Sequence, residues 1–263
     1  MTEPAAPVAL VTGASSGIGR AIALELAGRG YDLVVTARRK ELLEALRAEV
    51  LTTHGRRVVV IAADLGLRSD CERVEAAIGE GVDILVANAG FSTRGWFPRL
   101  PVETEVAEVE LNVVSTLRLC HAAAAMMSRR GLGRILVTSS AASFQPLPGL
   151  ATYGATKAFL TSFAQALDAE LRPAGVSVSC LAPGYTWTDP GAPRPRPRWL
   201  WSTSEEVARV AVEGLLAGRP LIVPGLPWKV VAVLAPRVPR ALVRRLAAAV
   251  GRRMQDPDRH GRS

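Results

Sequence analysis

The sequence Thr12-Gly13-Ala14-Ser15-Ser16-Gly17-Ile18-Gly19 gives the first indication of the fold of this 263-residue chain. It ends an apolar β-rich run, Val8–Thr12, and opens a helical pattern at residue 17. Glycines in a strand-to-helix turn let the backbone close tightly and approach a pyrophosphate, whose charge the helix N-terminus favours. The spacing is G-x-x-x-G-x-G, which differs from the G-x-G-x-x-G fingerprint. On its own, the turn is consistent with a phosphate site or with a purely structural role.

Apolar β-rich runs alternate with helical patterns on the C-terminal side of this turn. Continuous apolar runs are typical of strands buried on both faces of a parallel sheet. Seven strands are predicted, at Val8–Thr12, Asp32–Thr36, Val58–Ala62, Ile84–Ala87, Arg134–Thr138, Val176–Leu181 and Leu221–Val223. Helices are predicted at roughly 17–29, 39–54, 68–79, 103–129, 150–172 and 203–217. The alternation predicts an α/β fold, a single Rossmann-type doubly wound parallel sheet of about seven strands with helices on both faces.

Two segments interrupt the alternation. Residues 183–202 are rich in Pro, Arg and Trp, and a loop of this length inside a compact domain is typical of a lid or binding loop. Residues 225–263 follow the last strand and include a predicted Arg-rich amphipathic helix at about 240–253. We therefore predict a Rossmann-type domain over residues 1–224 and a basic C-terminal extension, with a disordered tail from residue 254.

Composition and charge narrow the function classes. The chain is 49% hydrophobic and 21% charged, which argues against disorder. Residues 1–193 hold 18 basic and 19 acidic side chains, whereas residues 194–263 hold 14 and 5, so the last 70 residues carry the whole excess of the +8 net charge. A neutral domain with a basic end does not resemble a nucleic-acid-coating protein, and we expect no nucleic-acid partner. The basic helix could contact an anionic membrane, grip an acidic partner, or dock on the domain or a neighbouring subunit.

Cysteine and histidine usage argues against metal and disulfide chemistry. Cys71, Cys120 and Cys180 are widely spaced, which favours buried reduced thiols. The three histidines lack metal-ligand spacing, so no metal site is expected. We find neither a signal-peptide pattern nor an apolar run near the roughly 18–20 residues that span a bilayer. The expectation is a cytoplasmic protein, with peripheral membrane association through the C-terminal helix left open.

Chemistry-bearing side chains follow the ends of two predicted strands. The second strand is followed by Ala37-Arg38-Arg39. An acidic residue there would suit a ribose 2′-OH, whereas Arg suits a 2′-phosphate, so Arg38 favours NADP(H) over NAD(H). Alternatively, both arginines only cap a solvated turn. The fifth strand ends at Ser139-Ser140, and a serine at that end can face the crevice where ligands bind in open α/β sheets.

Tyr153 and Lys157 are spaced i, i+4, which places them on one helix face. A free phenol has a pKa near 10, and an adjacent ammonium would lower it, bringing proton transfer within reach near neutrality. Taken alone, such a pair is more often a surface pair. Its combination with the glycine turn and a strand-end serine is far more specific.

These motifs, in this order, resemble the short-chain dehydrogenase/reductase family over roughly residues 7–224. The resemblance implies that Ser140, Tyr153 and Lys157 are catalytic and that Asn112 helps fix a water-linked proton path. The residues that it implies for NADP(H) binding are Gly13, Ser15, Ser16, Gly17, Ile18, Gly19, Arg38, Asp64, Leu65, Asn88, Ala89, Gly90, Tyr153, Lys157, Pro183, Gly184, Thr186 and Thr188. Ala87 and Thr186 depart from the family pattern without placing catalysis in doubt.

The same resemblance implies an NADP(H)-dependent oxidoreductase that interconverts a ketone or aldehyde and an alcohol by hydride transfer, as a homodimer or homotetramer. An alternative of another class is a noncatalytic dinucleotide-sensing or scaffold protein on the same fold. The intact set Ser140, Tyr153 and Lys157 argues against it, because a sensor needs no proton donor.

Aromatic residues cluster in two loops that follow strands. Trp187, Trp199 and Trp201 lie in or beside residues 183–202, and Trp96 follows the fourth strand. They favour an apolar small-molecule substrate, of an acyl, steroid-like or aromatic kind. The same aromatics could instead pin the loops to the core.

Overall fold

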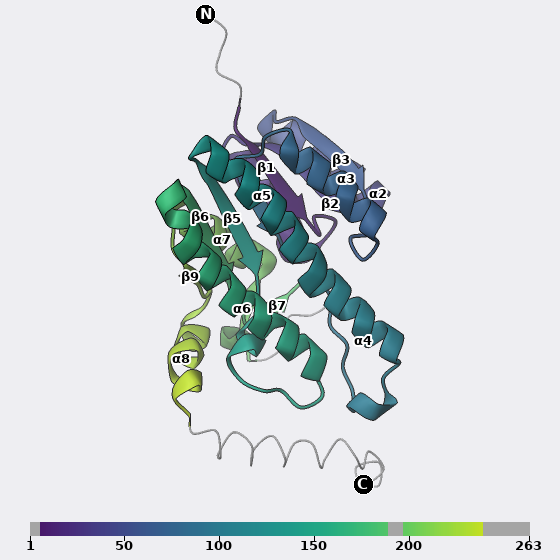
Figure 1. Cartoon of the computed structure of the whole chain (residues 1–263), viewed down its shortest axis with the longest axis vertical. Helices are drawn as coiled ribbons and strands as arrows, with labels where there is room; N and C mark the ends of the chain where they lie inside the picture. Colours follow the sequence, from purple (N-terminus) through teal and green to yellow (C-terminus); the bar gives the residue numbers. More distant parts are fainter. Residues whose placement is uncertain (1–5, 189–196, 239–263) are drawn as a thin grey trace, which may run out of the picture.

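A computed structural model describes residues 6–188 and 197–238 of the chain and contains one large parallel sheet (Figure 1). Its seven strands lie in the order β3-β2-β1-β4-β5-β6-β9. Their bounds are β1 (Val8–Thr12), β2 (Asp32–Ala37), β3 (Val58–Ala62), β4 (Ile84–Ala87), β5 (Gly133–Thr138), β6 (Val176–Leu181) and β9 (Leu221–Ile222). The predicted doubly wound α/β fold is confirmed.

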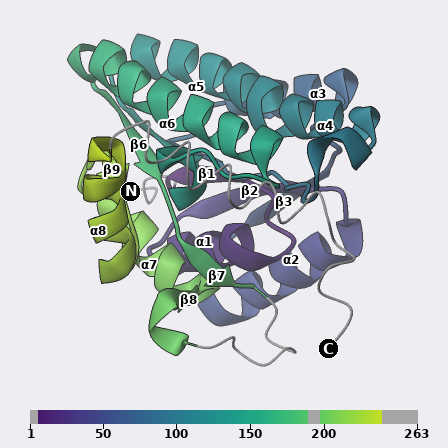
Figure 2. The same ribbon diagram turned by 90° about the horizontal axis from the view of Figure 1, so that it is seen from below.

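Helices cover both faces of the sheet (Figure 2). Helices α1, α2 and α7 pack on one face, and α3, α5 and α6 pack on the other. The helix bounds are α1 (Gly17–Gly28), α2 (Lys40–His54), α3 (Arg68–Gly79), α4 (Val102–Val109), α5 (Thr116–Arg130), α6 (Ala151–Leu171), α7 (Ser204–Leu216) and α8 (Leu226–Leu234). The described helices include none that is long and apolar enough to cross a membrane.

β1 shows why each strand of the sheet is a continuous apolar run in the sequence. Ala9 and Val11 belong to the core under α1, α2 and α7, whereas Leu10 belongs to the core under α3, α5 and α6, and all three are fully buried. Successive residues thus face opposite hydrophobic layers. β1 pairs with both β2 and β4, and the chain leaves these central strands in opposite directions across the sheet. Their carboxyl ends define a switch point, where α/β sheets bind ligands.

Two predicted elements differ from the structure. The single helix expected at 103–129 is α4, a π-helical turn at Glu110–Ser115, and α5. A π-helical turn adds a residue to the helix and is frequently found at functional sites. The predicted loop 183–202 contains a short two-stranded parallel pair, β7 (Tyr185–Trp187) with β8 (Trp201–Thr203). This pair joins the two ends of the loop through contacts that local sequence does not reveal.

The C-terminal prediction is only partly covered by the structure. Within the predicted extension, the described residues form α8 and a 3₁₀ turn at Ala235–Arg237. The Arg-rich helix expected at 240–253 and the tail beyond it lie outside the described residues. The division at residue 224 stays a prediction. The three cysteines are free and buried, as expected.

Candidate active site

The glycine-rich turn between β1 and α1 is shaped for backbone approach. Gly13 and Gly17 adopt φ angles of +66° and +56°, which L side chains rarely adopt. A Cβ at Gly19 would overlap the carbonyl oxygen of Gly13, so no side chain fits there. The turn is therefore tightly closed, and the N-terminus of α1 that follows it is suited to a pyrophosphate.

Thr12 joins this turn to the end of β4. Its hydroxyl accepts hydrogen bonds from the backbone N–H of Asn88 (2.8 Å) and of Ala89 (2.9 Å). The Asn88 amide donates back to the carbonyl oxygen of Thr12 (3.1 Å). A Cβ at Gly13 would lie 3.0 Å from the Ala89 Cα. The two central strand ends thus meet as a rigid floor at the switch point.

The predicted adenosine end lies at the carboxyl ends of β2 and β3. Arg38 is exposed and makes no hydrogen bond within the described residues, whereas the Arg39 guanidinium donates to Ser15 Oγ (3.0 Å) and Ser16 Oγ (2.7 Å). Asp64 Oδ1 accepts from the Gly66 N–H (3.0 Å) and so shapes the turn after β3. Arg39 is a residue that the sequence interpretation left out of the site. Its signal was present, because it directly follows Arg38.

Two adjacent serines at the end of β5 have different surroundings. Ser139 is buried, donates to the carbonyl oxygen of Lys157 (2.8 Å) and shares a hydrogen bond with Thr161 (2.6 Å). It thereby fixes α6 against the sheet. Ser140 caps the next short helix, and its hydroxyl accepts from the Ala142 N–H (3.1 Å). Of the two, Ser140 keeps a hydroxyl proton available for a ligand.

Tyr153 and Lys157 come together on α6, as predicted from their spacing. The Lys157 Nζ lies 5.7 Å from the centroid of the Tyr153 ring and donates to the Thr138 carbonyl oxygen (2.9 Å). Lys157 is only 5% exposed, and this burial lowers its pKa to about 8. The expectation that the ammonium lowers the pKa of Tyr153 is not met: burial raises that pKa, with a further increase from Glu108, while the Ser140 hydroxyl acts against both.

Asn112 lies in the π-helical turn and is fully buried. Its amide donates to the Phe91 carbonyl oxygen (2.9 Å) and to Thr156 Oγ1 (3.2 Å), and its oxygen accepts from the Phe91 N–H (3.1 Å). A Cβ at Gly90 would lie 2.7 Å from Asn112 Oδ1 and 3.6 Å from Lys157 Nζ. The loop after β4, the π-helical turn and the α6 ammonium therefore meet around Gly90.

The loop after β6 lies against the glycine-rich turn. A Cβ at Gly17 would lie 3.3 Å from the Thr188 methyl group, so this loop reaches the glycine-rich turn. Pro183 is buried, and the Thr186 hydroxyl donates to the Gly184 carbonyl oxygen (3.2 Å). A Cβ at Gly184 would overlap the indole ring of Trp228. The loop after β6 therefore connects the glycine-rich turn with α8.

An aromatic cluster holds the loop after β6 in place. Tyr185 stacks on Trp201 and packs edge-on against Trp228, with ring centroids 5.0 Å apart in both pairs. The Trp228 indole donates to the Leu200 carbonyl oxygen (3.1 Å). Gln145, in the loop after Ser140, donates to the carbonyl oxygen at the end of α8. Trp228 was not among the predicted site residues, because nothing in the local sequence connects α8 with the loop after β6.

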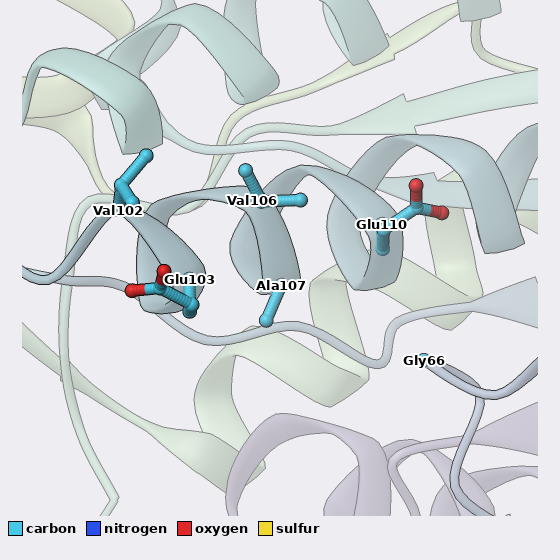
Figure 3. A pocket seen from close by; sticks show the side chains of 6 residues that line it. All are labelled: Gly66, Val102, Glu103, Val106, Ala107 and Glu110. Atoms are coloured by element: carbon cyan, nitrogen blue, oxygen red, sulfur yellow. The ribbon is translucent and has the colours of Figure 1, made fainter.

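Two surface pockets lie outside this constellation. One, of about 380 Å³, lies between Gly66 and the outer face of α4, where Val102 and Val106 are exposed and Glu103 and Glu110 lie at the rim (Figure 3). The other, of about 510 Å³, lies between α6 and the loop 143–148. Its α6 residues, among them Ala151, Ala155 and Ala158, are spaced along the helix face that turns away from Tyr153 and Lys157.

This fold and constellation define a dehydrogenase of the short-chain class. The chain belongs to the short chain dehydrogenase family, whose model matches residues 7–198. It is 33% identical over 261 residues to an uncharacterized oxidoreductase of Myxococcus xanthus (strain DK1622), covering 97% of this chain and 100% of that protein. It is 36% identical over 180 residues to a very-long-chain 3-oxoacyl-CoA reductase of Pyrenophora tritici-repentis (strain Pt-1C-BFP), covering 66% of this chain but only 53% of that relative. A short-chain dehydrogenase of Sphingobium yanoikuyae, solved in complex with NADPH, superimposes with a TM-score of 0.77 at 31% identity and 98% coverage of both chains.

Proposed function

We propose that this protein is an NADP(H)-dependent carbonyl reductase or alcohol dehydrogenase. The observation that supports the proposal is that the Ser140 hydroxyl, at the end of β5, and the Lys157 ammonium both lie beside Tyr153, near the carboxyl ends of the central strands. The glycine-rich turn, which has no room for a Cβ at Gly19, fits the pyrophosphate of a dinucleotide. When bound, the nicotinamide cofactor would supply or accept the hydride.

The side chains of the chain itself provide the proton chemistry. In the reductive direction Tyr153 would donate its phenolic proton to the substrate oxygen, while the Ser140 hydroxyl hydrogen-bonds that oxygen and stabilises its developing charge. The buried Lys157 ammonium would hold the nicotinamide ribose. In the oxidative direction the same groups act in reverse, with Tyr153 as the base.

The preference for NADP(H) rests on the second strand end. β2 is followed directly by two guanidinium groups, those of Arg38 and Arg39, and not by a carboxylate. Arg39 contacts the serine hydroxyls of the glycine-rich turn. A guanidinium is matched to a 2′-phosphate in geometry and charge. The NADPH complex of the Sphingobium yanoikuyae relative supports this preference.

An apolar substrate is supported by aromatic side chains that the fold does not bury. Trp199 is 71% exposed and Phe97 is 55% exposed, and both lie in loops at the carboxyl edge of the sheet. Exposed rings of this size do little to pin a loop to the core. The Pyrenophora relative acts on very-long-chain 3-oxoacyl-CoA, which is an acyl substrate of this apolar kind.

The test is turnover of a ketone and alcohol panel with NADPH and NADH, using wild type, Tyr153→Phe and a matched Tyr31→Phe control outside the site. We expect Tyr153→Phe to lose at least about 100-fold in turnover, and Tyr31→Phe to stay near wild type. Turnover by Tyr153→Phe at the wild-type rate would refute the mechanism. NADPH binding without turnover of any panel member would favour the alternative, a noncatalytic dinucleotide sensor.

Assembly and location are further parts of the proposal. We propose a cytoplasmic homodimer or homotetramer that buries the exposed valines of α4, namely Val109 together with Val102 and Val106, the two that Figure 3 shows. Sedimentation of wild type and Val106→Asp tests this, because the variant should dissociate.

Peripheral contact with an anionic membrane is supported by α8, where Leu226 is 75% exposed, and by the basic charge that follows it. Liposome sedimentation of the full chain against a truncation at residue 225 tests that contact.

A further inference from the structure

Three buried polar side chains line the inner edge of α4 and the π-helical turn. Glu105 is 6% exposed, and Glu108 and Asn112 are fully buried. Their spacing of three and four residues places them along one face of the helical rod. A buried carboxylate is costly unless a cation or hydrogen bonds compensate it. Across residues 6–188 and 197–238, neither glutamate takes part in an ion pair.

On one side, this polar edge holds the loop that follows β4. Glu108 Oε2 accepts from both the Thr93 N–H (3.0 Å) and the Thr93 hydroxyl (2.7 Å). Asn112, one turn later, holds Phe91 through both its N–H and its carbonyl oxygen. The loop begins at Gly90, which lies against the Lys157 ammonium. Glu108 therefore helps to fix the chain segment that adjoins the proton-donating pair.

On the other side, the same edge holds α6. Glu105 accepts a hydrogen bond from the hydroxyl of Thr152, the residue before Tyr153. Asn112 donates to the hydroxyl of Thr156, the residue before Lys157. These two hydrogen bonds thus hold α6 immediately beside Tyr153 and Lys157.

Glu108 differs from Glu105 in its electrostatic effect. Burial lowers the pKa of Lys157, while Cys180 and, to a smaller extent, the charge of Glu108 raise it. Burial raises the pKa of Tyr153, and the charge of Glu108 adds to this increase. Glu105 raises neither pKa, and the other titratable group that acts on Lys157 is Cys180 on β6. Arg94, in the same loop as Thr93, is exposed. The second carboxylate oxygen of Glu108 is buried and has no hydrogen-bond partner in the described structure.

We propose that Glu108 is a positioning residue for the Tyr153–Lys157 pair: its carboxylate fixes the loop after β4 and supplies the buried negative charge that keeps the Lys157 ammonium protonated. The consequence for turnover rests on the proposed function, whereas the effect on Lys157 does not. A neutral side chain of the same size should preserve the loop contact and lose only the charge.

The experiment uses three variants of the full chain. Glu108→Gln removes the charge and keeps the size, Glu108→Asp keeps the charge and shortens its reach, and Glu105→Gln removes a neighbouring buried charge as the matched control. The protonation of Lys157 is followed by NMR of its ε-methylene group against pH. The chain has only three lysines, so Lys157→Met suffices to assign this resonance. This readout needs neither cofactor nor turnover.

We expect Lys157 to titrate at lower pH in Glu108→Gln than in wild type, and at the wild-type pH in Glu108→Asp and Glu105→Gln. The pH at which reductive turnover falls should move down in the same variant, on the order of half a pH unit for one buried charge. A wild-type titration of Lys157 in Glu108→Gln would overturn the proposal, as would an equal shift in Glu105→Gln or Glu108→Asp. If Glu108→Gln does not fold, Glu108→Met serves as the neutral variant: a lower titration of Lys157 upholds the proposal and an unmoved one overturns it. A shifted titration without turnover of any substrate would refute the proposed function and leave the role of Glu108 standing.

Discussion

Replacing Lys157 with Met should make the protein more stable while removing its activity. Lys157 is 5% exposed, and within the described residues it has no carboxylate partner and one hydrogen bond, to the Thr138 carbonyl oxygen. An ammonium in such a position bears the cost of desolvation without the compensation of an ion pair. Methionine fills a similar volume without a charge.

The size of the expected gain in the free energy of unfolding follows from the pKa of the buried Lys157 ammonium. Burial lowers it from 10.5 to about 8, and this difference corresponds to about 3 kcal/mol at pH 7. The variant also leaves the Thr138 carbonyl oxygen without its donor, which costs about 1–2 kcal/mol. The net gain is then about 1–2 kcal/mol in the free energy of unfolding, or about 2–8 °C in Tm for a domain of this size.

The pH dependence gives the sharper test. Below pH 8 the folded protein carries the full cost of the buried ammonium. Between pH 8 and 10.5 the folded protein has released this proton, while the unfolded chain still holds it. Wild type therefore gains stability with rising pH relative to Lys157→Met, and the advantage of the variant at pH 7 should vanish toward pH 10.5.

The assay is urea unfolding of wild type, Lys157→Met and Lys40→Met at pH 7 and at higher pH. Lys40 is exposed at the start of α2, so its variant should stay within about 0.5 kcal/mol of wild type. The reasoning is refuted if Lys157→Met is less stable than wild type at pH 7. It is also refuted if the difference between the two does not change with pH.

Three further perturbations test separate contacts. Replacing Gly184 with Ala would place a Cβ in the Trp228 ring; we expect a loss of about 1–3 kcal/mol in urea unfolding, and unchanged stability would contradict the close approach. Arg39→Ala should raise the KM for NADPH about tenfold, the equivalent of one charged contact, and leave that for NADH unchanged; an equal effect on both would show that Arg39 serves only the fold. Thr203 caps α7 in a reciprocal capping box with Glu206, so Thr203→Ala should cost about 1 kcal/mol, and calorimetry that finds no change in Tm would argue that the cap contributes nothing.

The sheet could be predicted because its strands are apolar on both faces. Leu10 and Val11 belong to opposite hydrophobic cores, so the apolar run that contains them is continuous in the sequence. Such a run predicts a strand that is buried on both faces. The site could be predicted in outline for a related reason. Residues at the carboxyl ends of parallel strands, such as Asn88 and Ser140, must lie along one edge of the sheet.

The features that escaped prediction depend on contacts between distant segments. The π-helical turn at Glu110–Ser115 is itself helical and contains neither Gly nor Pro, so nothing in the local sequence separates α4 from α5. The β7–β8 pair and the Trp228 contact join segments that only the folded chain brings together. Glu108 is the clearest case, because a glutamate in a helix is ordinarily solvent-exposed and no local rule marks this one as buried.

The polar groups that cost the fold most are concentrated at its functional edge. Lys157, Glu108 and Asn112 are all at least 95% buried, and they hold the loop that follows β4: Asn112 and Lys157 lie beside Gly90, and Glu108 binds Thr93. Selection for stability alone would replace such groups with apolar side chains, because the cost of their burial is not returned as packing. Their presence together at the carboxyl ends of the strands is explained if a proton must be held and passed on there. The two predictions therefore test the same group of buried residues. The gain in stability of Lys157→Met measures what the buried ammonium costs the fold, and the lower titration of Lys157 in Glu108→Gln measures how its proton is held.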